Sequence, residues 1–329
     1  MANDYGSISQ RTAAWAATEM LAHAEPVAVL SKFGQSKPLP KNKADNVKFR
    51  RPVPFAAATT PLTEGVTPTA QAMSYEDVPV TIAQYGAVVQ ITDKVNDLAE
   101  DPVLKDASML CGEQAGDTVE AITWGVVKGG TNVIYGNGTA RAQVNTAVSL
   151  NKLRAAARFL MAQRAKRLTK MLSGSTNFET KPIEAAYVAF GHTDMEADIR
   201  NLAGFTPVAA YGSRQPLCPE EVGSVESIRI ILTPMLTPVL DAGSSTLNGM
   251  KTSGTKADVY PLVIIGQEAY GLVPLKGANA ITPSVINPDV KTKDDPLGQR
   301  GYVGWKTYFA AVRLNEAWLV RCEFAVTNL

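Results

Sequence analysis

The chain has 329 residues, about the length of two domains and enough to bury a core without disulfides or metals. Lysine and arginine total 32 against 31 for aspartate and glutamate, so the net charge of +1 provides no overall field that attracts nucleic acid or an anionic membrane. Charged residues make up 19% of the chain, below the roughly 25% of an ordinary soluble protein, which indicates surface that is not left to water.

Compartment and chemistry are constrained by a few residue types. The cysteines, Cys111, Cys218 and Cys322, are odd in number and widely spaced, which favours a reducing compartment over a disulfide framework. The first residues form no apolar core of a secretory signal, and the longest uncharged run, 78–92, is too short and polar to cross a bilayer. We therefore expect a soluble protein without a membrane partner.

The first 92 residues predict an arm and a projecting hairpin. An imperfect apolar stripe predicts a short helix over 7–24. Residues 32–51 contain seven basic residues, one acid and two prolines, which is typical of an extended arm. Segments 46–56 and 75–92 alternate as strands around a turn-rich stretch, 59–74, so we expect a long hairpin that leans on another chain.

The middle of the chain predicts two helices. Asp101 and Pro102 are a helix start, and apolar residues recur at helical spacing until Gly129, which predicts a helix of about 40 Å. Asn137 and Gly138 then predict a hairpin turn. Residues 149–170 predict an amphipathic helix rich in Lys and Arg and free of acids, whose basic face is solvated, contacts another subunit or faces DNA.

The last third predicts a mixed domain. Short apolar strands at 185–190, 227–232 and 259–265 alternate with loops and a helix near 193–202, so the fold class is α+β. Residues 277–301 are expected to be loop. Two alternating segments, 302–314 and 317–326, predict a terminal antiparallel hairpin.

No catalytic motif stands out. His192, Asp194, Glu196 and Asp198 resemble metal ligands, but alternate residues of a helix point in different directions, and an acidic first helical turn explains them better. An α/β enzyme built on these acids is one rival interpretation. We expect no catalytic residues, cofactor or metal.

Charge is segregated along the chain. Residues 93–120 hold eight acids and two basic residues, a net charge of −6, whereas residues 32–51 carry +6. Such strips suit contacts between copies of one protein, where complementary charge sets the register. The alternative is that each strip is a solvated face.

Six blocks in the same order resemble the major capsid proteins of tailed double-stranded DNA phages, in particular the coliphage N-four-like family. They are TTPLTEGVTP from Thr59, QYGAVVQITDKVND from Gln84, EDPVLKDASMLCGEQAGDTVEAIT from Glu100, GTNVIYGNG from Gly130, HTDMEADIRNLAGFTPV from His192 and YPLVIIGQEAYGLVPLKG from Tyr260.

This resemblance implies the Hong Kong 97 type capsid fold. It predicts an N-terminal arm at 1–45, an E-loop at 46–92, a P-domain at 93–180 with a spine helix at 102–128, an A-domain at 181–300 and a return hairpin to the P-domain at 301–329. In such shells hexamers and pentamers close an icosahedron around double-stranded DNA, with the E-loop lying over a neighbour. An encapsulin-like compartment of the same fold is the alternative function.

The resemblance also implies partners and a location. We expect a homo-oligomeric shell in the virion, assembled in the host cytoplasm, that encloses DNA without sequence-specific binding. Portal and scaffolding proteins are expected, and a decoration protein is compatible with the sequence. The candidate intersubunit contact residues are Lys37, Lys41, Lys43, Lys48, Arg50, Arg51, Glu64, Glu113, Asp117 and Glu120.

Overall fold

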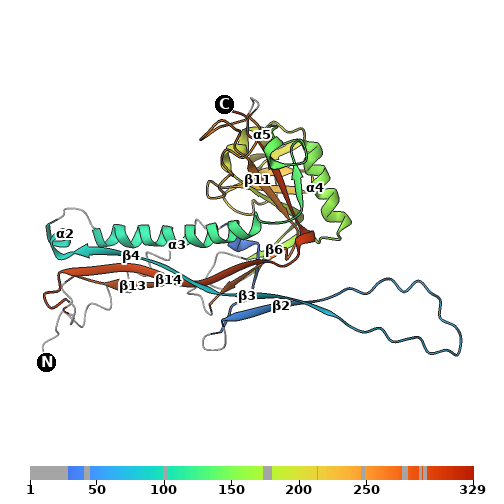
Figure 1. Ribbon diagram of the computed structural model, residues 1–329, viewed down its shortest axis with the longest axis horizontal. Coiled ribbons are helices and arrows are strands. Elements are labelled where there is room, and N and C mark those ends of the chain that lie inside the picture. Colours follow the sequence, from blue (N-terminus) through green and yellow to red (C-terminus); the bar gives the residue numbers. More distant parts are fainter. Residues whose placement is uncertain are drawn as a thin grey trace.

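The computed structural model has a long, narrow half and a compact half, with a loop that projects far from both (Figure 1). It describes residues 29–40, 45–98, 103–172, 180–212, 214–245, 249–275, 281–288, 291 and 295–329. The predicted helix at 7–24 and the candidates Lys41 and Lys43 lie outside these residues.

Helix α3 (Val103–Val127) lies along a five-stranded sheet in the long half (Figure 1). The sheet order is β1-β12-β14-β13, and β4 pairs with β14 as well. Ala107, Cys111 and Ala115 recur every four residues on α3, so their small side chains let the helix lie close to Ile91 and Trp305 of the sheet. The strand bounds are β1 Gln35–Ser36, β4 Ala83–Thr92, β12 Tyr270–Pro274, β13 Ile281–Ile286 and β14 Arg300–Arg313, and a short helix, α2 Asp93–Leu98, follows β4.

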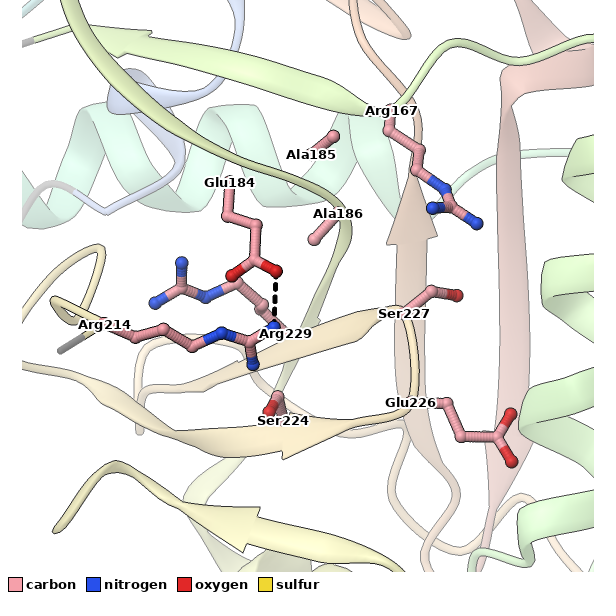
Figure 2. A pocket seen from close by; sticks show the side chains of 9 residues that line it. All are labelled: Arg167, Glu184, Ala185, Ala186, Arg214, Ser224, Glu226, Ser227 and Arg229. Carbon is pink, nitrogen blue, oxygen red and sulfur yellow. Dashed lines mark hydrogen bonds and ion pairs between the residues drawn. The ribbon is translucent and has the colours of Figure 1, made fainter. Parts of the chain in front are cut away.

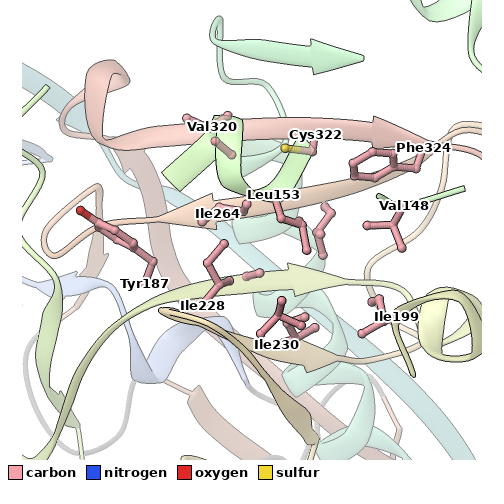
Figure 3. Packing of buried hydrophobic residues seen from close by; sticks show 14 of the residues in the cluster. Val148, Leu153, Tyr187, Ile199, Ile228, Ile230, Ile264, Val320, Cys322 and Phe324 are labelled. Carbon is pink, nitrogen blue, oxygen red and sulfur yellow. The ribbon is translucent and has the colours of Figure 1, made fainter. Parts of the chain in front are cut away.

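The compact half is built on an eight-stranded sheet with the order β5-β15-β11-β7-β10-β9-β8, and β6 pairs with β7. Helix α4 (Leu150–Ala162) packs Leu153 and Leu160 into the largest apolar cluster with residues of β7, β10, β11 and β15 (Figure 3). Every residue of β10 and β11 is buried, as expected of strands covered on both faces. The strand bounds are β5 Val133–Tyr135, β6 Leu168–Leu172, β7 Thr180–Gly191, β8 Phe205–Pro207, β9 Glu221–Val225, β10 Ile228–Leu232, β11 Tyr260–Ile265 and β15 Leu319–Phe324.

Short helices complete both halves. They are α5 Glu196–Arg200 and the 3-10 helices η2 Leu30–Lys32, η3 Arg141–Gln143, η4 Thr193–Met195, η5 Val208–Ala210 and η6 Glu316–Trp318. A second apolar cluster joins the halves, because Trp124 and Val127 of α3 contact the same group as Phe190 of β7 and Phe309 of β14.

The projecting segment, for which we keep the predicted name E-loop, begins as the antiparallel pair β2 (Asn46–Pro52) and β3 (Tyr75–Thr81). Val47 and Phe49 of β2 and Val80 of β3 are buried against Val273 and Ala310 of the long sheet. This alternation confirms strands over 46–52 and 75–81, the first parts of the two predicted strands, and fixes the base of the loop to the body.

Two predictions for the first 92 residues need correction. The segment 75–92 is not one strand, because it divides at Ile82 into β3 and β4. Strand β4 pairs over ten residues with β14, so the projecting part ends near residue 81. Residues 29–39 are not a free arm: Leu30 and Phe33 are buried, and β1 extends the long sheet beside β12.

The predicted domain boundaries also change. Helix α4, predicted in the P-domain, covers the compact sheet, whereas β12 and β13, predicted in the A-domain, belong to the long sheet. Strand β13 lies in the segment 277–301, which was expected to be loop. Its Pro283 occupies an outer strand, where a missing backbone donor is tolerated.

The prediction of a terminal hairpin is wrong. Strand β14 pairs with β4, β12 and β13, but β15 pairs with β11 and β5 in the other sheet. The Asn315 side chain accepts a hydrogen bond from the Ala317 amide at the start of η6, where the chain passes between the sheets. The turn at Asn137 and Gly138 likewise joins no hairpin, because β5 pairs in parallel with β15.

The spine helix is confirmed within one residue at each described end. The predicted basic helix is shorter, because α4 ends at Ala162 and residues 168–172 form β6. The mixed α+β fold class is confirmed as well.

Candidate assembly surfaces

The tip of the E-loop, residues 53–74, has no packing partner among the residues that the structure describes. Every residue from Pro52 to Asp77 is exposed, and none of residues 53–74 belongs to a helix or strand. Five large apolar side chains lie in this stretch, with exposed fractions from 45% at Val53 to 77% at Leu62, the other three being Phe55, Val66 and Met73. Isolated apolar residues on a surface are ordinary, but this concentration in one extended segment marks an interaction site.

Glu64 is the only charged residue of the stretch 53–74 and is exposed at the tip. The next residue, Gly65, has a φ of +75°, a conformation that an L side chain rarely adopts. The loop therefore presents one negative charge at its turn, between apolar flanks.

The basic candidates at the base of the E-loop have partners in the same hairpin. Arg50 contacts Asp77 at 2.7 Å and Arg51 contacts Glu76 at 2.5 Å, each directly across from its partner in the β2–β3 register. The hydrogen bond from Arg50 lowers the pKa of the Asp77 carboxyl. We did not identify Glu76 and Asp77 from the sequence, although pairing the two predicted strands would have placed them opposite the arginines.

Lys37 also contacts the E-loop base. Its Nζ donates to the backbone oxygen of Lys48 at 2.7 Å and lies 5.4 Å from the centre of the Phe49 ring. Lys48 itself is exposed on β2. In the described part of the basic strip, the charges of Arg50 and Arg51 are therefore neutralised by acids of β3, whereas Lys37 donates to an uncharged backbone oxygen.

The acidic candidates on α3 differ in burial. Glu113 and Asp117 are half-buried and one helical turn apart. Burial raises the pKa of Asp117, and the charge of Glu113 raises it further. Glu120 is completely buried and accepts hydrogen bonds from the Leu30 amide, so it is not available on the surface of the chain.

An apolar groove lies where β4, α2 and α3 meet. It has a volume of about 470 Å³. Val89, Val95 and Leu110 on its walls are 42%, 45% and 60% exposed. The other apolar lining residues are Ile91, Val103 and Ala107, and the polar ones are Gln90, Thr92 and Asp106. The sequence did not reveal this groove, because its walls come from three elements whose contact is tertiary.

A polar pocket of about 160 Å³ lies in the compact half (Figure 2). Arg214 pairs with Glu184 across it at 2.5 Å, and the buried Arg229 pairs with Glu221 beneath it at 2.7 Å. Arg167 lies over the Tyr187 ring. Arg214 and Arg229 each pair with a carboxylate of the compact half, so these charges hold neighbouring segments of this half together.

The acids near His192 have structural roles. The Asp194 amide donates to His192 Nδ1 at 3.2 Å, and Tyr260 donates its hydroxyl hydrogen bond to Asp194 at 2.8 Å. Asp198 accepts hydrogen bonds from the amide and hydroxyl of Thr327. Within the described residues no three His, Cys, Asp or Glu side chains are grouped to hold a metal ion, and no helix among them is long and apolar enough to cross a membrane.

Comparison with known proteins identifies the family. A family model described as phage capsid protein matches residues 75–321, well over half of the chain. The chain belongs to this family of phage capsid proteins. It is therefore a structural protein of the virion, and the enzyme and encapsulin-like alternatives are not favoured.

Solved capsid structures show the same fold. The capsid of Ralstonia phage GP4 matches with a TM-score of 0.69 and 16% identity over 91% of each chain. The capsid of cyanophage P-SCSP1u matches with a TM-score of 0.59 and 12% identity, covering 91% of this chain and 89% of that one. The capsid of cyanophage Pam1 matches with a TM-score of 0.58 and 14% identity, covering 94% of this chain and 93% of that one.

These likenesses confirm the predicted Hong Kong 97 type fold for this phage capsid protein. Among curated proteins no sequence match is found. We use the predicted names E-loop, P-domain and A-domain as labels for the projecting hairpin, the long half and the compact half.

Proposed function

We propose that this phage capsid protein forms hexamers and pentamers that close an icosahedral shell around double-stranded DNA, assembling in the host cytoplasm. The observation that carries the proposal is the fully exposed E-loop tip on a base fixed to the body. A segment with this much unpacked apolar surface is stabilised only when another copy covers it. The near-neutral chain suits a wall that encloses DNA without gripping it.

The apolar groove between β4, α2 and α3 is our candidate for the surface that receives the tip. Its exposed walls, Val89, Val95 and Leu110, offer apolar area to side chains such as Leu62 and Val66 of a second copy. Burying several such side chains supplies about 1.5–3 kcal/mol each before the cost of ordering the loop.

Charge pairing between copies is the second part of the proposal. The basic residues Lys37, Lys41, Lys43, Lys48, Arg50 and Arg51 meet acids of adjacent subunits, with Glu113 and Asp117 as partners and Glu64 as the charge at the loop tip. We leave Glu120 out of this set because it is buried within its own chain. Exposed pairs such as Arg51 with Glu76 exchange partners at little cost, which allows an in-chain pair to become an intersubunit pair.

Other proteins assist assembly of the complete virion in this proposal. We propose a portal protein at one vertex and a separate scaffolding protein during assembly. A decoration protein on the outer surface is compatible with the exposed faces of the chain.

Electron microscopy and sizing of the purified chain test the role of the tip. Wild type should form shells, and Leu62→Ser with Val66→Ser should remain as small oligomers. The groove variant Leu110→Glu should fail in the same way, whereas Leu240→Glu, an exposed apolar position in the compact half, is the matched control. Normal shells from both the tip and groove variants would contradict the proposed contact.

A charge swap tests the electrostatic part. Arg50→Glu with Arg51→Glu breaks the in-chain pairs and any contact with a neighbour. Adding Glu76→Arg and Asp77→Arg restores the in-chain pairs with reversed sign. We expect no shells from either form. Shells from the double variant, or shells rescued by the fourfold swap, would show that these arginines act only within the E-loop base.

A further inference from the structure

The junction between the N-terminal segment and the body is held by a buried carboxylate. The backbone amide of Leu30 donates to both oxygens of Glu120, at 2.9 and 3.2 Å. The hydroxyl of Tyr270 donates to the backbone oxygen of Leu30 at 2.5 Å. Two side chains from α3 and β12, remote in sequence, thus satisfy both backbone groups of one residue.

The same junction connects the two halves of the molecule. Val29, Leu30 and Phe33 are buried, and the Phe33 ring lies 5.4 Å from that of Phe190 in β7. Immediately downstream, β1 pairs with β12 in the long sheet. Any displacement of residues 29–33 would uncover apolar surface on both α3 and β7.

Glu120 is isolated from water and surrounded by groups of mixed sign. Its side chain is completely buried, and burial raises its pKa to about 7 against the favourable hydrogen bonds of the Leu30 and Val29 amides. The charge of Lys32 in η2 lowers the pKa of Glu120, and the charge of Glu220, before β9, raises it. Tyr270 and Cys218 are the other titratable groups of this cluster, and both keep their protons because burial raises their pKa values.

We propose that Glu120 is a proton-controlled clasp that sets how firmly residues 29–33 are docked on the body. The docked state binds a proton on Glu120 more tightly than an undocked, solvated state does. Docking is therefore strongest at low pH, weakens as the pH rises from the ordinary carboxyl value of 4.5 to about 7, and is constant above that. The clasp would let residues 29–33 leave the body more readily above neutral pH, a property beyond the shell-forming role.

Hydrogen exchange of the full-length, unassembled chain tests the clasp. We expect the protection factors of the amides in 29–33, corrected for intrinsic exchange, to fall by up to about tenfold per pH unit between pH 5 and 7. Above pH 7.5 they should level off. Glu120→Gln keeps one accepting oxygen but cannot ionise, so its protection factors should not change with pH over the same range.

Two further variants keep the test decisive if Glu120→Gln folds poorly. Tyr270→Phe removes the hydrogen bond to Leu30 but keeps the carboxylate, so protection should be lower at every pH while its pH dependence remains. Asp106→Asn, an exposed acid on the same helix, is the matched control and should behave as wild type. A pH-independent wild type, or an unchanged pH dependence in Glu120→Gln, would overturn the proposal.

Discussion

The A-domain sheet and the E-loop tip contain similar apolar residues, but these are buried in the sheet and exposed in the tip. Phe190 in β7 is completely buried, whereas Phe55 in the tip is 55% exposed. The first is stabilised by its own chain, since β7 is covered on both faces by α4 and by the cluster with α3. The second has apolar area that its own chain leaves uncovered, so its energy is gained only between chains.

The largest expected effect is on the free energy of unfolding when each of the two phenylalanines is truncated to alanine. Phe190→Ala should lower the free energy of unfolding of the unassembled chain by about 3–5 kcal/mol, because it leaves a cavity between β7 and Phe33. Phe55→Ala should change it by less than about 0.5 kcal/mol. Urea denaturation of both variants measures this contrast. Equal losses would mean that the tip packs on its own body.

Breaking a buried ion pair in the A-domain should have a somewhat smaller effect. Arg229→Met leaves Glu221 buried without its cation, and we expect a loss of about 3 kcal/mol. Glu221 keeps its bonds from the Leu217 amide and the Tyr211 hydroxyl, which limits the loss.

Arg214→Met is the matched control for this variant. It breaks an exposed pair with Glu184 in the same pocket and should cost no more than about 1 kcal/mol. Thermal unfolding of the two variants gives the comparison. A loss for Arg214→Met as large as that for Arg229→Met would contradict the difference in burial.

The smallest expected effect is that of removing the Arg50–Asp77 pair at the E-loop base. Because Arg50 lowers the pKa of Asp77, the pair stabilises the β2–β3 hairpin above the ordinary carboxyl value of 3.8. That stabilisation is lost as the pH falls through the lowered value. In an NMR titration, Arg50→Gln should move the midpoint of the Asp77 carboxyl upward toward 3.8.

Arg51→Gln is the neighbouring control, because Arg51 pairs with Glu76 instead. It should leave the Asp77 midpoint where it is. An Asp77 midpoint that does not respond to Arg50→Gln would show that the exposed pair forms only transiently.

Local patterns in the sequence predicted the elements that depend on neighbours along the chain. The spacing of Ala107, Cys111 and Ala115 predicted α3, and the alternation of Val47 and Phe49 predicted β2. The exposed E-loop tip also followed from its Pro, Thr and Gly content. These features required no knowledge of distant partners.

Strand pairing was predicted less well. Alternation in β14 and β15 predicted two strands and a short connection, but not that they enter different sheets. For the same reason β13 was not predicted. Its Pro283 and Ser284 are typical of a loop, and the segment is a strand because it pairs with Trp305 and Gly304 of β14. Periodicity shows that a residue faces a core, and it does not show which core.

Some candidate contact residues were found from the sequence, but their partners and their burial were not. Arg50 and Arg51 were found because they cluster in sequence, but their partners Glu76 and Asp77 lie across a hairpin whose register only the fold supplies. Glu120 was grouped with Glu113 and Asp117 as surface charge, and the docking of η2 on α3 made it a buried acceptor instead.

The sequence by itself predicted the family, through its resemblance in six ordered blocks. It also predicted the fold class, the spine helix and a projecting loop, because these follow from local pattern and composition. Only the tertiary structure decided which strands pair, where the two domains divide and which charges are free. Those outcomes depend on contacts between residues far apart along the chain, and Glu120 with Leu30 is the clearest example.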